Sequence, residues 1–350
     1  MPPITSRPVA QTLAAQLSVS QTSSNPGTGT GTVMETFETT SFPERMGNAA
    51  NYAYGGCALG AGVQAAYQTV PKGYKPYSIS GSFLAPVSTE AKLHCAVRRL
   101  RDTKTFATRL VEISQVQPKP QVGKQKEGSG SQRLCMIMLA DFQREGEDAL
   151  LTYSARPDRT YSPPEACLTP QELVSKTVAA GTIPPESEAK YNTLFGLLAR
   201  LFETRLAGEG IGAQNLTGMA KSSITDQDHL PLPSKTTADW IRSRTPLSRE
   251  SDQYAGLVFL LDSYLSFLPL VHSKRFIDDA GACASLDFSV RVFSSEWDLT
   301  DWNFRELKTV AGGEGRTYSE SRLWNREGKL VANMTQQSIL RPLKGPKPVL

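Results

Sequence analysis

The same order of segments occurs twice along the chain: one apolar, helix-like segment and then several strand-like segments. In the first occurrence, residues 55–70 place their larger apolar side chains on one helical stripe, and alternating segments then continue to Gln143. In the second, residues 254–271 are helix-like, and strand-like segments follow as far as Leu340. This repeat predicts an α+β fold with an internal duplication, in which each unit wraps an antiparallel sheet on one long helix. Two such units can pair their sheets into one body.

The composition varies along the 350 residues enough to predict separate regions. The first 32 residues close with the string SSNPGTGTGT, which is too polar and too rich in glycine to pack. A polar insertion at 116–133 predicts a long exposed loop, and a Pro-, Ser- and Thr-rich part predicts a connector with one amphipathic helix around EAKYNTLFGLLARLFETR. The predicted regions are a disordered tail at 1–32, an N-terminal domain at 33–150, a connector at 151–237 and a C-terminal domain at 238–350.

Charge and hydropathy restrict the partners of the chain. The net charge is only +4, and the basic residues are scattered without a stacking motif, so we expect no nucleic-acid partner. No apolar run approaches the ~20 residues that a membrane span needs, and the N-terminus lacks the apolar core of a signal peptide. We therefore expect no membrane partner and an intracellular, cytoplasmic location. The C-terminal Pro-Val-Leu is no peroxisomal tripeptide, although a peroxisomal location stays open.

Cysteine and histidine usage argues against disulfides and metal ions. The five cysteines are far apart and mostly set among apolar residues, which is typical of core thiols in a reducing compartment. The three histidines show no metal-ligand spacing, so we expect neither a metal nor a cofactor.

An acidic residue, Asp262, interrupts the strongly apolar segment at 256–273. Burying an unpaired carboxylate costs several kcal/mol or more. Either Asp262 is placed there for chemistry, or it faces solvent at the edge of a helix.

The glycine-rich string GGCALGAG begins the first helix-like segment. It lacks the ending of a P-loop and the spacing of a dinucleotide fingerprint. Its small residues would let the start of the helix press closely against a sheet. The backbone N–H groups of Gly55, Gly56 and Cys57 could also hold an anion or a polarised carbonyl at the helix N-terminus.

Several strings, in the same order through both halves, resemble the acyl-CoA thioesterase II family of double hot-dog thioesterases. In the first half and the connector they are YAYGGCALGAGVQAA, GSFLAP, LRDTKTFATRLVEISQ, MLADFQ, FETR and DWIRSR. In the second half they are the segment around Asp262, CASLDFSVRVF and ANMTQQSILRP. The resemblance implies two hot-dog domains, an acyl-CoA substrate, hydrolysis to free acid and CoA, and association into homo-oligomers.

The family hydrolyses thioesters with a water held by an Asp, a Ser or Thr, and a Gln, which the resemblance carries onto Asp262, Ser285 and Gln336. The family usually has Thr where this chain has Ser285, and the hydroxyl is kept. A second alignment would place Tyr264 at the position of the acid, but a tyrosine is a poor base at neutral pH. Gln337 faces the opposite side of a strand from Gln336, so the choice between them depends on register.

Other functions remain open at the level of sequence. A hydratase or dehydratase on this fold needs an acid–histidine pair, and only His272 follows Asp262 on the same segment, which disfavours that reaction. The chain could also be a non-catalytic acyl-thioester binding protein, or a thioesterase of a specialised biosynthetic pathway that acts on a carrier-bound acid. The acyl group, the carrier and the oligomeric state are not defined by the sequence.

Overall fold

One twelve-stranded antiparallel sheet dominates the fold. The computed structural model describes residues 9–25, 34–47, 52–116, 131–146 and 148–343. The strands are β1 (Val19–Asn25), β2 (Met34–Thr39), β3 (Tyr74–Phe83), β4 (His94–Asp102), β5 (Phe106–Val116), β6 (Gln132–Arg144), β7 (Phe202–Leu206), β8 (Thr237–Ser243), β9 (Ala280–Val292), β10 (Asn303–Gly313), β11 (Arg316–Trp324) and β12 (Leu330–Pro342). The predicted loop at 116–133 falls almost wholly outside the described residues.

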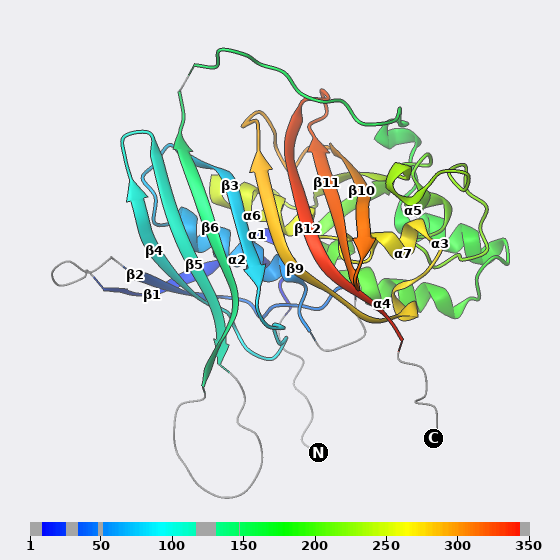
Figure 1. Cartoon of the computed structure of the whole chain (residues 1–350), viewed down its shortest axis with the longest axis horizontal. Helices are drawn as coiled ribbons and strands as arrows, with labels where there is room; N and C mark the ends of the chain where they lie inside the picture. Colours follow the sequence, from blue (N-terminus) through cyan, green and yellow to red (C-terminus); the bar gives the residue numbers. More distant parts are fainter. Residues whose placement is uncertain (1–8, 26–33, 48–51, 117–130, 147, 344–350) are drawn as a thin grey trace, which may run out of the picture.

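Some helices cover one face of this sheet, and others lie beyond one of its edges (Figure 1). The helices are α1 (Leu13–Leu17), α2 (Gly55–Tyr67), α3 (Pro170–Ala179), α4 (Glu186–Leu201), α5 (Ile211–Gln214), α6 (Glu250–Leu261) and α7 (Leu268–His272), with short 3-10 turns at Pro164–Ala166, Leu232–Ser234 and Ile277–Asp279. Figure 1 shows α2 and α6 behind the sheet, and α3, α4, α5 and α7 beyond β10.

The strand order confirms the internal duplication. The order is β1-β2-β4-β5-β6-β3-β9-β12-β11-β10-β8-β7. Counted outward from the centre, β3-β6-β5-β4-β2-β1 in the first half corresponds strand by strand to β9-β12-β11-β10-β8-β7 in the second. The two halves join where β3 pairs with β9, from Ser78 opposite Arg291 to Ser82 opposite Asp287. Each half contributes one central helix, and α2 packs against α6. The fold is therefore a double hot-dog with a continuous sheet.

Glycines allow the two central helices to approach closely. A Cβ atom on Gly56 would lie 2.8 Å from the main-chain oxygen of Phe259, and one on Gly60 would lie 3.2 Å from that of Ala255. The first contact is too short for any side chain, and the second is tighter than most Cβ contacts. The sequence predicted close packing of this helix start against a sheet, and at these two positions the neighbours are the side chains of Tyr54 and Leu17 and the main chain of the other helix.

Residues 9–25 correct the prediction that 1–32 is a disordered tail. Thr12 caps α1 by accepting a hydrogen bond from the backbone N–H of Ala15. Leu13 and Leu17 are fully buried, and a Cβ on Gly256 would lie 2.8 Å from a methyl group of Leu13. The short apolar stretch around these leucines packs on the helices, and β1 then pairs with β2. The segment is polar on average, so its composition did not indicate that these two leucines anchor it to the helices.

The predicted helix at 254–271 is broken, because α6 ends at Leu261 and α7 begins only at Leu268. Pro269 prevents a continuous helix only from Leu265 onward, since proline lacks the N–H that would bond to the carbonyl of Leu265 and its ring clashes with that carbonyl. Between the two helices Tyr264 has a φ of +75°, which side chains other than glycine rarely adopt. The break places Asp262 at the end of a helix instead of in its middle.

The predicted connector contributes to the sheet. Its amphipathic helix is α4, but the FETR string leaves the helix and forms β7, which pairs with β8 at the edge of the sheet. In the strand order β7 takes the place that β1 takes in the first half.

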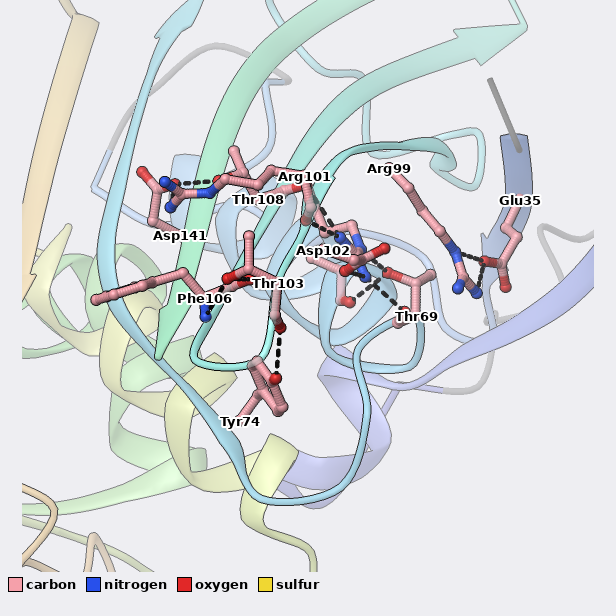
Figure 2. Close-up of polar contacts among 12 residues, drawn as sticks. Glu35, Thr69, Tyr74, Arg99, Arg101, Asp102, Thr103, Phe106, Thr108 and Asp141 are labelled. Atoms are coloured by element: carbon pink, nitrogen blue, oxygen red, sulfur yellow. Dashed lines mark hydrogen bonds and ion pairs between the residues drawn. The ribbon is translucent and has the colours of Figure 1, made fainter. Parts of the chain in front are cut away.

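The LRDTKTFATR string ties the β4–β5 hairpin to the C-terminal end of α2. Arg109 is fully buried and donates to the hydroxyl and main-chain oxygens of Thr69, at 2.8 and 2.9 Å, and to Asp102, at 2.7 Å. Figure 2 shows Asp102 beside Thr69, with the hydroxyl of Tyr74 reaching the main-chain oxygen of Thr103 in the turn. This motif therefore has a structural role at the end of α2.

Candidate active site

A buried carboxylate, Asp262, lies at the C-terminal end of α6. Its side chain accepts a hydrogen bond of 2.6 Å from Nε2 of Gln336 on β12. Gln336 is fully buried, and Asp262 is 5% exposed. Among the described residues, no Lys, Arg or His forms an ion pair with this carboxylate. The structure thus brings together two of the three residues that the sequence predicted, 74 positions apart.

The N-terminus of α2 closes the other side of the carboxylate. A Cβ on Gly55 would lie 2.9 Å from Oδ2 of Asp262, and the backbone N–H of Gly56 donates a hydrogen bond to the carboxylate. Burial raises the pKa of Asp262 to about 6, although the hydrogen bonds from Gln336, Gly56 and Tyr54 act in the opposite direction. The carboxylate is therefore ionised at neutral pH but is a stronger base than an exposed aspartate.

The N–H groups predicted as an oxyanion site are partly engaged within the protein. The N–H of Gly56 faces Asp262, and the N–H of Cys57 donates to the main-chain oxygen of Tyr54 at 3.0 Å. Burial raises the pKa of the Cys57 thiol to about 12, so the thiol stays protonated at neutral pH. Binding of an oxyanion by Gly55, Gly56 and Cys57 stays a prediction.

Ser285 lies on β9 beside β12, and the hydrogen bonds described for this part of the chain do not join it to Asp262 or Gln336. Within the described part of the chain, the hydroxyl that contacts Gln336 belongs to Ser338, whose Oγ donates to Oε1 at 3.2 Å. Ser338 is the cross-strand partner of Ser285, after a bulge in the β9–β12 pairing. Sequence reasoning missed Ser338, although its position two residues after Gln336 on a strand places both side chains on one face.

The alternative register is disfavoured by the geometry. Tyr264 packs against Phe195 and Phe267, with ring centroids 5.6 and 5.3 Å away, and burial raises its pKa well above the ordinary value. The side chain of Gln337 lies on the opposite face of β12 from that of Gln336. The backbone N–H of Gln337 donates to the side chain of Asp287 at 3.3 Å. Neither residue takes the place of Asp262 or Gln336.

A buried ion pair holds the end of α6 and was also missed at the level of sequence. Arg305 on β10 pairs with Asp239, which lies opposite it on β8, with a shortest distance of 2.6 Å. The same guanidinium donates to the main-chain oxygen of Leu260 at 2.9 Å and to the hydroxyl of Ser263. These contacts fix the residues on both sides of Asp262. DWIRSR contains Asp239, but nothing in that string indicates its distant partner.

His272 does not form an acid–histidine pair with Asp262 in the described structure. It is fully buried on α7, and its Nε2 lies 3.1 Å from the hydroxyl of Thr237. Burial lowers the pKa of its ring to about 3. This arrangement weighs against hydratase or dehydratase chemistry at Asp262.

Comparison with known proteins agrees with this architecture and identifies the family. Residues 42–143 match the family model described as acyl-CoA thioesterase N-terminal domain, and residues 189–340 match acyl-CoA thioesterase C-terminal domain. The fold and these matches define a thioester hydrolase of the double hot-dog class. The chain belongs to the acyl-CoA thioesterase family, since the two models together cover more than half of it.

Solved structures share the fold across almost the whole chain. A tesB protein from Mycobacterium avium subsp. paratuberculosis is 17% identical, with a TM-score of 0.60, and the match covers 94% of this chain and 98% of that one. The acyl-CoA thioesterase II TesB2 from Mycobacterium marinum is 18% identical, with a TM-score of 0.61 and coverage of 96% and 99%. A protein of unknown function with a hot-dog fold from Alicyclobacillus acidocaldarius is 16% identical, with a TM-score of 0.58 and coverage of 95% and 98%.

A membrane-spanning helix needs about 20 mostly apolar residues. Within the described residues, no helix is both long and apolar enough to cross a bilayer.

Replacing Ser338 with alanine is expected to lower turnover of a thioester about 3- to 10-fold, because the Gln336 amide loses the hydrogen bond that holds its orientation toward Asp262. The matched control is Ser321→Ala, which removes a buried hydroxyl on β11 that has no hydrogen-bond partner among the described residues. Initial rates of thiol release measure both variants. Equal rates for Ser338→Ala and the wild type would contradict the orienting role.

Proposed function

We propose that this protein hydrolyses acyl-CoA thioesters to free acid and CoA with a water activated by Asp262. The observation that carries the proposal is a buried carboxylate that has no cationic partner among the described residues, is hydrogen-bonded to Gln336 and lies at the N-terminus of α2. Such a carboxylate combines a fixed position with a pKa close to that of a working general base.

The proposed reaction needs few groups because a thioester carbonyl is already reactive. Asp262 takes a proton from water while the water oxygen bonds to the carbonyl carbon. The tetrahedral intermediate then expels the thiolate as the C–S bond breaks, and the proton held by Asp262 passes to the sulfur. Gln336 holds the carboxylate in place, and Ser285 is the proposed second contact of the water. The N–H groups at Gly55–Cys57 are proposed to stabilise the negative charge on the carbonyl oxygen, which requires those of Gly56 and Cys57 to give up their acceptors, Asp262 and the main-chain oxygen of Tyr54.

The test is thiol release from a panel of acyl-CoAs with short to long chains, followed as free CoA. Release with any member, at a rate well above the buffer, supports the proposal and defines the substrate class. If acyl-CoAs bind without thiol release, the better description is a non-catalytic acyl-thioester binding protein. If only a carrier-bound acid is hydrolysed, the protein serves a biosynthetic pathway. Homo-oligomerisation and a cytoplasmic location stay predictions.

The pH dependence of kcat/KM is expected to report the ionisation of Asp262. Only the ionised carboxylate accepts the proton, so kcat/KM should rise about tenfold per pH unit below the pKa and level off above about pH 7. The midpoint is expected near 6, the value to which burial raises this pKa. Initial rates across this range, with circular dichroism at both ends to confirm folding, measure the profile. A rate that is flat, or that falls as the pH rises through 6, would contradict the assignment.

A further inference from the structure

A cavity of about 440 Å³ lies outside the candidate active site, and neither Asp262 nor Gln336 lines it. One wall is the loop between β2 and α2, including Glu44 and Arg45, and the other is α4, including Thr193, Leu197 and Arg200. The backbone N–H of Gly47 donates to the main-chain oxygen of Leu194 at 2.8 Å, which joins the two walls. The described residues of the two walls are therefore in direct contact.

Glu44 connects this cavity to the start of α2. Its main-chain oxygen accepts a hydrogen bond of 2.8 Å from the N–H of Tyr54 and one of 3.8 Å from the thiol of Cys57. The charges of Glu44, Asp262 and Arg200 all act on the pKa of that thiol. Through Tyr54 and Cys57, Glu44 therefore links the lining of the cavity to the start of α2.

The charges in the cavity favour an anion. Arg200 pairs with Glu44 at 2.5 Å, which neutralises one positive charge, and the exposed Arg45 adds another. The Nε of Arg200 is buried and has no acceptor among the described residues. A buried N–H without an acceptor is unfavourable, and a phosphate oxygen is an acceptor that a guanidinium binds well.

We propose that this cavity binds the phosphate of a phosphopantetheine arm through Arg45 and Arg200, with the thioester end of the arm directed toward the start of α2. The inference rests on the proposed function and adds a binding site to it. The arm has two sources with the same chemistry, coenzyme A and an acylated carrier protein. In both, a phosphate is joined to the thioester by the same flexible chain.

The test compares two substrates with the same acyl group, acyl-CoA and acyl-pantetheine, which lacks phosphate. For Arg45→Glu, kcat/KM with acyl-CoA is expected to fall at least about tenfold, mainly through KM, because an attractive charge becomes repulsive. With acyl-pantetheine it should stay within about twofold of the wild type. The matched control is Arg326→Glu, an exposed arginine outside the cavity. Equal losses with both substrates, or no loss with acyl-CoA, would overturn the proposal.

A binding measurement separates this inference from the proposed hydrolysis. Free CoA is titrated calorimetrically into the wild type and Arg45→Glu. Weaker binding by Arg45→Glu supports the phosphate site even if no thioester is hydrolysed. Equal binding, or no binding by either protein, overturns the site even if hydrolysis is observed. Parallel rates with acyl-CoA and an acylated carrier protein then show which source of the arm the protein uses.

Discussion

Asp262→Asn is expected to lower the turnover of a thioester at least ~100-fold, the usual contribution of a general base. Asparagine keeps the shape of the side chain and can still accept the hydrogen bond from Gln336, but it cannot take a proton from water. Rates of thiol release by the wild type and the variant, with the substrate at saturation, measure the loss.

The control for this variant is Asp252→Asn at the opposite end of the two central helices. Asp252 is also buried and also accepts a hydrogen bond from a glutamine, Gln64 on α2. It differs in that Arg249 forms an ion pair with it at 2.7 Å. Asp252→Asn should therefore leave turnover close to that of the wild type. Turnover by Asp262→Asn at the wild-type rate would show that Asp262 is not the base.

Stability provides an independent readout of the same carboxylate. The pKa of Asp262 is raised from 3.8 to about 6 in the folded chain, so the unfolded chain releases this proton first as the pH rises. The wild type therefore loses folding free energy between about pH 4 and pH 7, by up to ~3 kcal/mol. Asp262→Asn does not titrate, so its stability relative to the wild type should increase across this range.

Arg305→Met is expected to lower the free energy of unfolding by ~3–5 kcal/mol, because it leaves Asp239 buried without its cation. It also removes the donors to Leu260 and Ser263 that fix the end of α6. Chemical denaturation, followed by circular dichroism, measures the change. The matched control is Arg326→Met, since its ion pairs are exposed and its loss should cost less than about 0.5 kcal/mol.

A double variant distinguishes the lost ion pair from lost packing. Arg305→Met combined with Asp239→Leu removes both buried charges, so it should recover a substantial part of the stability lost by Arg305→Met alone. A denaturation midpoint for Arg305→Met equal to that of the wild type would contradict the role assigned to this pair.

Much of the fold could be predicted from local patterns. Strands β4 and β5 could be predicted from the alternation of their apolar residues, and helix α2 from the helical spacing of its apolar residues. The duplication followed from the order of these segments, and the strand order confirms it. Leu13 and Leu17 were missed because a short anchor inside a polar segment has little weight in a compositional average.

The geometry of the candidate site could be predicted only in part. Asp262 and Gln336 followed from the resemblance, but the apolar periodicity did not reveal the break after α6, where Tyr264 adopts a positive φ. The proximity of Ser338 to Gln336 could have been read from strand alternation. The pairing of Arg305 with Asp239 could not, because it joins strands that are distant in sequence.

The central claim is that a water activated by Asp262 attacks the thioester carbonyl. A single turnover in ¹⁸O-labelled water, with enzyme in excess over acyl-CoA, tests it most directly. We predict one ¹⁸O atom in the released acid and none in the peptide that contains Asp262. Unlabelled acid together with ¹⁸O in Asp262 would show that the carboxylate itself attacks the thioester, and would contradict the water mechanism.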